Sequence, residues 1–211
     1  WVAWQYEERG GKSTKIPISA TKGGMASSTN PATWSTFEQA IAACRHCNEN
    51  TGIGFVFAAD DPYCGIDIDK CIDPSTGEPK PWAQVILRDL NSYSEISPSG
   101  TGVKIIVQAR KIGKRCKSSL GDGAIEIYET GRYFTITGLR LDSSSSDVEV
   151  RQDQFDALYE RVFASPKPSA ESTEAASPTV AAPNPHAPAT DEAVVRILEC
   201  SKNGERFRHL W

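Results

Sequence analysis

A change in composition near residue 165 limits what this chain can fold into. Residues 165–190 consist mainly of Pro, Ala, Ser and Thr, hold six of the 13 prolines and contain no aromatic residue. Such a segment cannot bury enough apolar surface to form a core, so it predicts a flexible linker. Residues 1–164 have the length of one domain of ordinary size. Residues 191–211 resume with apolar residues at helical spacing, which predicts the beginning of a truncated helical module.

The charge and hydropathy of the chain restrict its partners. A formal net charge of -4 argues against a protein that coats nucleic acid through net positive charge, so any such contact would be local. Apolar runs such as 53–59 are too short to span a bilayer, and the first eight residues do not resemble a signal peptide. We therefore expect a cytoplasmic protein without a membrane partner. The absence of an initial Met and the apolar-rich ending at 207–211 suggest a monomeric fragment of a longer protein.

The periodicity of apolar residues predicts an α+β fold. Strands are expected where apolar and β-branched residues alternate or cluster, namely over 1–6, 52–59, 65–69, 103–108, 124–128 and 133–137. The last three of these could pair as a meander. Helices are expected over 35–48, where Ser35-Thr36-Phe37-Glu38 matches a capping box, over 81–90 and over 148–164. Residues 9–30 have no periodicity and predict a loop.

Acidic residues alternate with isoleucines in two of the expected strands. Asp67 and Asp69 occupy alternate positions, so their carboxylates share a face with Cα atoms roughly 6.5 to 7 Å apart. Carboxylates at this spacing can converge on a pair of Mg²⁺ or Mn²⁺ ions, which prefer oxygen ligands. Glu126, within 124–128, could supply a third carboxylate. Considered alone, each acid also fits the solvated face of an antiparallel strand.

A glycine-rich segment precedes the strand expected over 103–108. Ser97-Pro98-Ser99-Gly100-Thr101-Gly102-Val103-Lys104 combines two glycines, several hydroxyl groups and a cation. Glycines allow backbone amides to approach an anion closely. The segment therefore predicts a cradle for a triphosphate, although a hairpin turn followed by an exposed lysine has the same composition.

Cationic residues are concentrated in two other segments. Five of the eight residues in 110–117 are Lys or Arg, and the expected first loop carries Lys12, Lys15 and Lys22. Both segments fit either contacts with template phosphates or a solvated surface. The candidate DNA-binding residues are Arg110, Lys111, Lys114, Arg115, Lys117, Lys12 and Lys15.

The six cysteines occur in a chain without secretory features, which favours reduced thiols over disulfides. Cys44-Arg45-His46-Cys47 resembles half of a zinc site, but no second pair follows at a suitable spacing. We therefore interpret the cysteines as structural.

The order of the motifs resembles that of a known family. The motifs are Asp-x-Asp at 67–69, Ser-Pro-Ser-Gly-x-Gly-x-Lys at 97–104, Ile-Glu-Ile-Tyr at 125–128 and Gly-Arg-Tyr-Phe-Thr-x-Thr-Gly at 131–138. Together they resemble the primase-polymerase domains of the archaeo-eukaryotic primase superfamily. Further similarity to the phage and plasmid members lies in 1–4, 12–17, 33–37 and 52–55, so the resemblance covers roughly residues 1–140.

This resemblance implies a fold and a set of site residues. The fold is an α+β catalytic core with a mixed or antiparallel sheet, an RRM-like metal-binding part and flanking helices. Catalytic and metal-binding roles, with two Mg²⁺ or Mn²⁺ ions expected, pass to Asp67, Asp69 and Glu126. Nucleotide-binding roles pass to Ser99, Gly100, Gly102, Lys104 and Arg132. The second motif of the family usually ends in His, and the lysine found here keeps a positive charge but is not a proton donor tuned to neutral pH.

The implied activity is template-directed joining of dNTPs or NTPs on single-stranded DNA, as primer synthesis, DNA polymerisation or both. In similar phage and plasmid replication proteins a helical region and often a helicase follow this domain, so a helicase is an expected partner. Two other classes of function fit the same residues. One is a non-catalytic module that binds nucleotides or single-stranded DNA, and the other is a metal-dependent nuclease.

Overall fold

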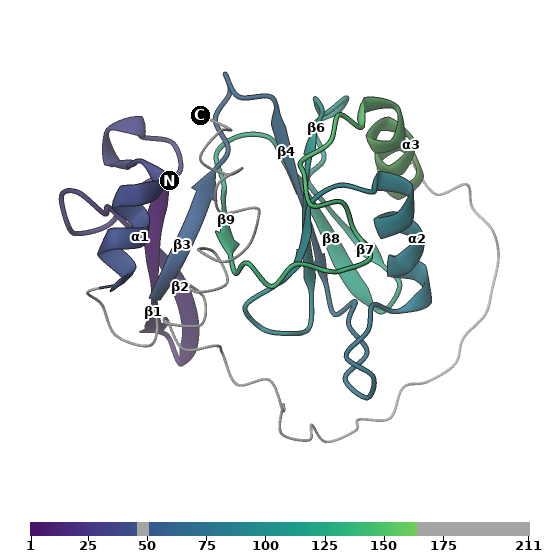
Figure 1. Cartoon of the computed structure of the whole chain (residues 1–211), viewed down its shortest axis with the longest axis horizontal. Helices are drawn as coiled ribbons and strands as arrows, with labels where there is room; N and C mark the ends of the chain where they lie inside the picture. The colour runs from purple at the N-terminus through teal and green to yellow at the C-terminus, as the bar shows by residue number, and fades with distance from the viewer. Residues whose placement is uncertain (46–50, 164–211) are drawn as a thin grey trace.

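The computed structural model describes residues 1–45 and 51–163. Within these ranges the chain is α+β, with two antiparallel sheets between helices (Figure 1). The expected linker over 165–190 and helical module over 191–211 lie outside the described residues.

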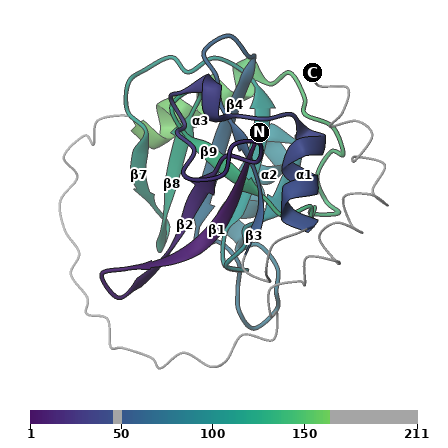
Figure 2. The same ribbon diagram turned by 90° about the vertical axis from the view of Figure 1, so that its left-hand side faces the viewer.

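The first sheet has the strand order β2-β1-β3-β9. Its strands are β1 (Val2–Arg9), β2 (Lys12–Ile18), β3 (Thr51–Val56) and β9 (Tyr133–Ile136). Gly10 and Gly11, at φ 59° and 76°, form the two-residue turn that joins β1 to β2. The β1–β2 hairpin forms a long twisted ribbon (Figure 2).

The prediction that residues 9–30 form only a loop is therefore wrong. β2 is an edge strand whose first half, Lys12–Thr14, is exposed on both faces, so it has no apolar alternation to reveal it. Its pairing with β1 is what makes it a strand. This pairing places the second half of β2 close to the rest of the domain.

The second sheet has the strand order β5-β6-β4-β8-β7. Its strands are β4 (Tyr63–Asp69), β5 (Ser94–Ile96), β6 (Val103–Gln108), β7 (Lys117–Leu120) and β8 (Gly123–Tyr128). The expected meander is wrong, because β4 lies between β6 and β8, and β9 pairs with β3 in the first sheet. Most of β4 is buried, and hydrogen bonding along both of its edges satisfies its backbone groups.

Helices cover the outer faces of the two sheets (Figure 1). α1 (Phe37–Arg45) packs against β1 and β3, whereas α2 (Pro81–Leu90) and α3 (Gln152–Phe163) cover the second sheet. A short 3-10 helix (Pro31–Thr33) precedes α1. None of the described helices has the length and apolar character needed to cross a membrane.

The helix boundaries follow local capping and pairing. α2 has the predicted bounds, with Pro81 in its first turn and Asn91 in the left-handed conformation at its end. The capping box of α1 is formed by Thr36 and Gln39, one residue later than predicted, with reciprocal hydrogen bonds of 3.0 and 3.3 Å. α3 begins at 152 rather than 148, because Val150 forms a parallel bridge with Gln108. The predicted positions 46–48 and 164 lie outside the described residues.

The isoleucines of the acidic strands form the core beneath α2 and α3. Ile66, Ile68, Ile105, Ile125 and Ile127 are fully buried in one cluster with these helices. Because alternate strand residues point to opposite faces, the acids between these isoleucines point away from the helices. A second cluster, which includes aromatic residues of both sheets, packs between the sheets and against α1.

The described cysteines form no disulfide. Cys44, Cys64 and Cys71 are buried, and Cys116 is partly exposed. Burial raises the pKa of Cys64 and Cys71, the latter to about 12, so both are unreactive thiols at neutral pH. Cys47, the other half of the considered zinc motif, lies outside the described residues.

Candidate functional site

A row of five ionisable residues crosses the second sheet. Asp67 on β4 lies directly opposite Lys104 on β6 and Glu126 on β8. The row continues to Glu95 on β5 and Lys117 on β7. Directly opposed residues on adjacent strands point to the same face of a sheet. The strand pairing therefore brings Glu126 beside Asp67, on the face that the helices leave uncovered.

A cavity of about 310 Å³ opens on this face. All three predicted metal ligands line it, together with predicted nucleotide-binding residues from the 97–104 segment and from the turn before β9. The first sheet contributes residues from β2 and β9. The lining residues are Lys15, Asp67, Asp69, Ser97, Pro98, Ser99, Lys104, Glu126, Tyr128, Arg132, Tyr133, Phe134 and Thr135.

The glycine-rich segment forms the connection between β5 and β6. The Ser97 N–H donates to the Gly102 carbonyl (2.9 Å), and the Gly102 N–H donates to Ser97 Oγ (3.2 Å). Gly100 adopts φ 72°, a left-handed conformation that favours glycine. The segment is thus a hairpin connection, but the lysine that follows it is buried rather than exposed, and Ser99 lines the cavity.

Gly102 packs directly against β4, which leads to a prediction about stability. A Cβ atom at this position would lie 2.7 Å from the Ile68 carbonyl oxygen and 3.2 Å from Ser97 Oγ. We expect Gly102→Ala to lower the free energy of unfolding by about 1 to 3 kcal/mol, because β6 must move away from β4. Urea denaturation measures this change. Glu8→Ala, on the exposed part of β1, should change stability by less than about 0.5 kcal/mol, and equal effects of the two substitutions would contradict the packing argument.

Two of the three acids pair with lysines. Lys104 Nζ lies 2.6 Å from Asp67 Oδ2 and 4.5 Å from the centre of the Phe134 ring, with 9% of the lysine side chain exposed. Glu126 accepts hydrogen bonds from Lys117 Nζ and from the Tyr128 hydroxyl (2.9 Å). Asp69 has neither a hydrogen bond nor an ion pair with another described side chain.

The surroundings of Asp69 and Glu126 shift the pKa values of these two acids in opposite directions. Burial raises the pKa of Asp69, and repulsion from Asp67 raises it further. Burial also acts to raise the pKa of Glu126, but the hydrogen bonds from Lys117 and Tyr128 outweigh it, so the pKa lies below its usual range. Asp69 has no side-chain partner in the part of the chain that the structure describes, so its carboxylate would gain most from an added cation.

The donor set of the cavity fits a hard divalent cation, because three carboxylates line one space. Among residues 1–45 and 51–163, no three His, Cys, Asp or Glu side chains already stand close enough together to hold a metal ion. The carboxylates of Asp67 and Glu126 instead form ion pairs with Lys104 and Lys117.

Comparison with known proteins agrees with the motif order. No protein-family model matches the chain. Over 140 residues, or 65% of its length, the chain is 39% identical to the DNA primase-polymerase of Nitratiruptor phage NrS-1. This similarity supports the resemblance to phage-type primase-polymerase domains. The match spans 19% of the length of that relative.

The candidate DNA-binding residues differ in their contacts within the domain. Lys117 pairs with Glu126, and Lys111 Nζ contacts Cys116 Sγ at 2.9 Å. Arg115 donates to the Phe163 carbonyl at the end of α3 (3.0 Å) and stacks on the ring of Phe163. Arg110, Lys114 and Lys12 are exposed, whereas Lys15 lines the cavity. Lys111, Arg115 and Lys117 thus have contacts within the domain, and the DNA-binding role of this set stays a prediction.

The sequence did not lead us to assign Tyr128 to the cavity, or Glu95 to the row of ionisable residues beside it. Tyr128 is two positions after Glu126 on β8, so strand alternation alone could have assigned it to the cavity face. Its hydroxyl accepts from Arg132 Nη2 (3.0 Å) and donates to Glu126. Glu95, by contrast, lies on a three-residue strand that no local pattern predicts.

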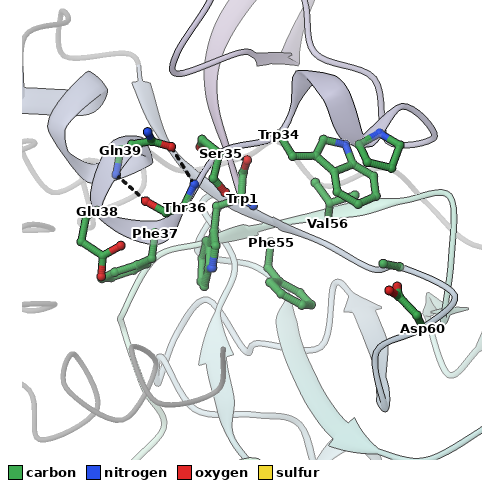
Figure 3. Close-up of a pocket in the computed structure, with 12 residues that line it drawn as sticks. Trp1, Trp34, Ser35, Thr36, Phe37, Glu38, Gln39, Phe55, Val56 and Asp60 are labelled. Carbon is green, nitrogen blue, oxygen red and sulfur yellow. Dashed lines mark hydrogen bonds between the residues drawn. The ribbon is translucent and has the colours of Figure 1, made fainter.

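A second cavity, of about 640 Å³, lies beside the start of α1 (Figure 3). Trp1, Trp34, Phe37 and Phe55 supply much of its apolar lining, and Asp60 stands at its border. It contains none of the predicted site residues. The smaller cavity therefore remains the candidate site.

Proposed function

We propose that this domain catalyses template-directed nucleotidyl transfer, making or extending DNA primers in phage-type replication. One observation carries the proposal. Three acids, the serines of the connection between β5 and β6, and Arg132, which are far apart in the sequence, line a single cavity. The name of the related phage protein supports the same activity.

In this proposal Asp67, Asp69 and Glu126 hold two Mg²⁺ or Mn²⁺ ions. Bound divalent ions would lower the pKa of the attacking 3′-hydroxyl group and neutralise charge on the departing pyrophosphate. Asp69, which pairs with no side chain within residues 1–45 and 51–163, offers an immediate ligand. Metal binding at Asp67 and Glu126 requires their oxygens to be shared with, or released from, Lys104 and Lys117.

The remaining residues would bind and orient the nucleotide. Ser99 lines the cavity, and its hydroxyl group offers a hydrogen bond to phosphate oxygens. The predicted roles of Gly100 and Gly102 are indirect, because their N–H groups donate to the Ser97 carbonyl and Oγ and neither glycine lines the cavity. Lys104 and Arg132 supply positive charge, and Tyr128 orients the Arg132 guanidinium through a hydrogen bond. Holding the reacting groups in place is a large part of catalysis in phosphoryl transfer. A lysine in place of the usual histidine meets this requirement as a fixed charge.

The wider assignment follows from the same activity. The second sheet with α2 and α3 would form the RRM-like metal-binding part of a primase-polymerase core. Single-stranded DNA would serve as template, dNTPs or NTPs as substrates, and a helicase in the same replication system as a partner.

Metal removal tests the proposed function. The chain is incubated with a primed single-stranded template and dNTPs in Mg²⁺ or Mn²⁺, and the products are resolved by length. We expect extension with either ion, none after chelation by EDTA, and recovery when excess metal is restored, because three carboxylates cannot act together on phosphates without cations.

Two other results would overturn the proposal in favour of a different class. Tight dNTP binding without any extension would indicate a non-catalytic binding module. In such a module the ion pair between Lys104 and Asp67 would persist when the nucleotide binds. Metal-dependent shortening of the primer in the absence of dNTPs would indicate a nuclease.

A further inference from the structure

Lys15 reaches the candidate site from the opposite sheet. It lies on β2, directly opposite Tyr6 of β1, and is half-buried. Its side chain lines the cavity that contains Asp67 and Asp69. Lys15, which was expected in a loop, thus lies on a strand and faces the candidate site.

The ammonium group of Lys15 has no anionic partner among the described residues, unlike Lys104, whose Nζ is bonded to Asp67. Its neighbours are the faces of Tyr6 and Trp4, with Nζ 5.1 Å and 6.0 Å from the ring centres. Burial lowers the pKa of Lys15, and repulsion from Lys104 lowers it further, while Asp67 and Asp69 act in the opposite direction. A partly desolvated cation without a bonded anion gains when an anionic ligand enters.

The backbone of Lys15 is also held in place. The Tyr133 hydroxyl at the start of β9 donates to the Lys15 carbonyl oxygen (2.8 Å). Tyr133 itself lines the cavity, and Arg132 precedes it in the turn. Lys15 therefore has a fixed position relative to the other candidate phosphate-binding groups, which reduces the entropy lost when it binds a ligand.

We propose that Lys15 binds the phosphates of the incoming nucleoside triphosphate, so that the nucleotide is held between the two sheets. This inference rests on the proposed function of the cavity. It assigns Lys15 to the nucleotide rather than to the template strand. The β1–β2 hairpin is then part of the active site, and not only a cover for the first sheet.

The test compares two affinities in the same preparations of the full chain. The dissociation constant for dATP with Mg²⁺ is measured by calorimetry, and that for a fluorescent single-stranded oligonucleotide by anisotropy. We expect Lys15→Met to weaken dATP binding by about 10- to 100-fold, the range for a lost hydrogen bond to a charged group. Binding of the oligonucleotide should change by less than about twofold, which is under 0.5 kcal/mol.

Two variants serve as controls. Lys15→Arg keeps the charge and should restore dATP binding to within about threefold of the original, since guanidinium also binds phosphate. Arg9→Met removes an exposed cation from β1 of the same hairpin, outside the cavity lining, and should leave dATP binding unchanged. Thermal unfolding of each variant shows whether a change in affinity reflects a change in folding.

Several results would overturn the inference. These are weaker oligonucleotide binding with unchanged dATP binding, a lower Tm with both affinities unchanged, and no dATP binding by the unsubstituted chain. Primer extension is measured in parallel. If dATP binding depends on Lys15 but no extension occurs, the inference stands and the proposed polymerisation fails.

Discussion

Asp69→Asn is expected to abolish primer extension while leaving the domain at least as stable as before. The substitution keeps the shape of the side chain but replaces a carboxylate with a weaker metal ligand. Losing one metal ligand removes several kcal/mol of transition-state stabilisation, which corresponds to a rate decrease of about 10³-fold or more. The experiment isolates the chemistry because no described side chain depends on Asp69 for a hydrogen bond or an ion pair.

The expected effect on stability follows from the pKa of Asp69. Burial and then repulsion from Asp67 raise this pKa in the folded chain. The folded state therefore holds the proton more tightly than the unfolded state, so the contribution of Asp69 to stability falls as pH rises from its ordinary pKa through the raised one. Above that range the ionised group is unfavourable to folding. Asparagine removes this penalty, and the Tm at neutral pH should be unchanged or higher.

Single-turnover primer extension and thermal unfolding measure the two effects. Asp142→Asn is the matched control, because Asp142 is a fully exposed carboxylate outside the cavity lining. The control should extend primers at the original rate. Normal extension by Asp69→Asn, or loss of activity accompanied by a clearly lower Tm, would refute the role assigned to Asp69.

Glu95→Ala is expected to lower the free energy of unfolding by roughly 3 to 5 kcal/mol. Glu95 is 1% exposed and accepts three hydrogen bonds, from the Tyr93 hydroxyl (2.8 Å), the Thr137 N–H (2.9 Å) and the Gly138 N–H (3.0 Å). Thr137 and Gly138 directly follow β9, so this carboxyl group joins the end of a first-sheet strand to β5 of the second sheet. Alanine would leave these donors without their acceptor and create a void between the sheets.

Urea denaturation measures the change, with two comparison variants. Glu95→Gln keeps one carbonyl acceptor and should show an intermediate loss, whereas Glu8→Ala on the exposed part of β1 should change stability by less than about 0.5 kcal/mol. If Glu95→Ala is as stable as Glu8→Ala, the carboxyl group does not join the sheets.

The pH dependence of the Glu95 variants is also expected to have a definite sign. Burial raises the pKa of Glu95, although its hydrogen bonds act in the opposite direction. Its folded-state pKa therefore lies above that of the unfolded chain, and its contribution to stability declines as pH rises between the two values. The stability advantage of the original chain over Glu95→Gln should shrink across that interval, and an advantage that grows with pH would contradict the assigned shift.

Local patterns predicted much of this domain. The alternation of Ile66 and Ile68 with Asp67 and Asp69 showed which side chains face the core and which face outward, because burial of apolar side chains decides the orientation of a strand. Pro81 correctly predicted the first turn of α2, because the fixed φ of proline suits the start of a helix. The two aspartates of the candidate site could therefore be predicted to share a face.

The pairing of strands determined which other residues join these aspartates in the candidate site. This pairing depends on contacts between residues far apart in the chain. Only the register of β4 with β8 puts Glu126 opposite Asp67, and only pairing with β1 turns Lys12–Ile18 into a strand that carries Lys15 to the cavity. β9 likewise belongs to the first sheet rather than to the expected meander, because it pairs with β3. Local sequence determines which face a side chain occupies. The choice of neighbouring strands depends on packing over the whole domain, so only the tertiary structure decided which charges meet in the site.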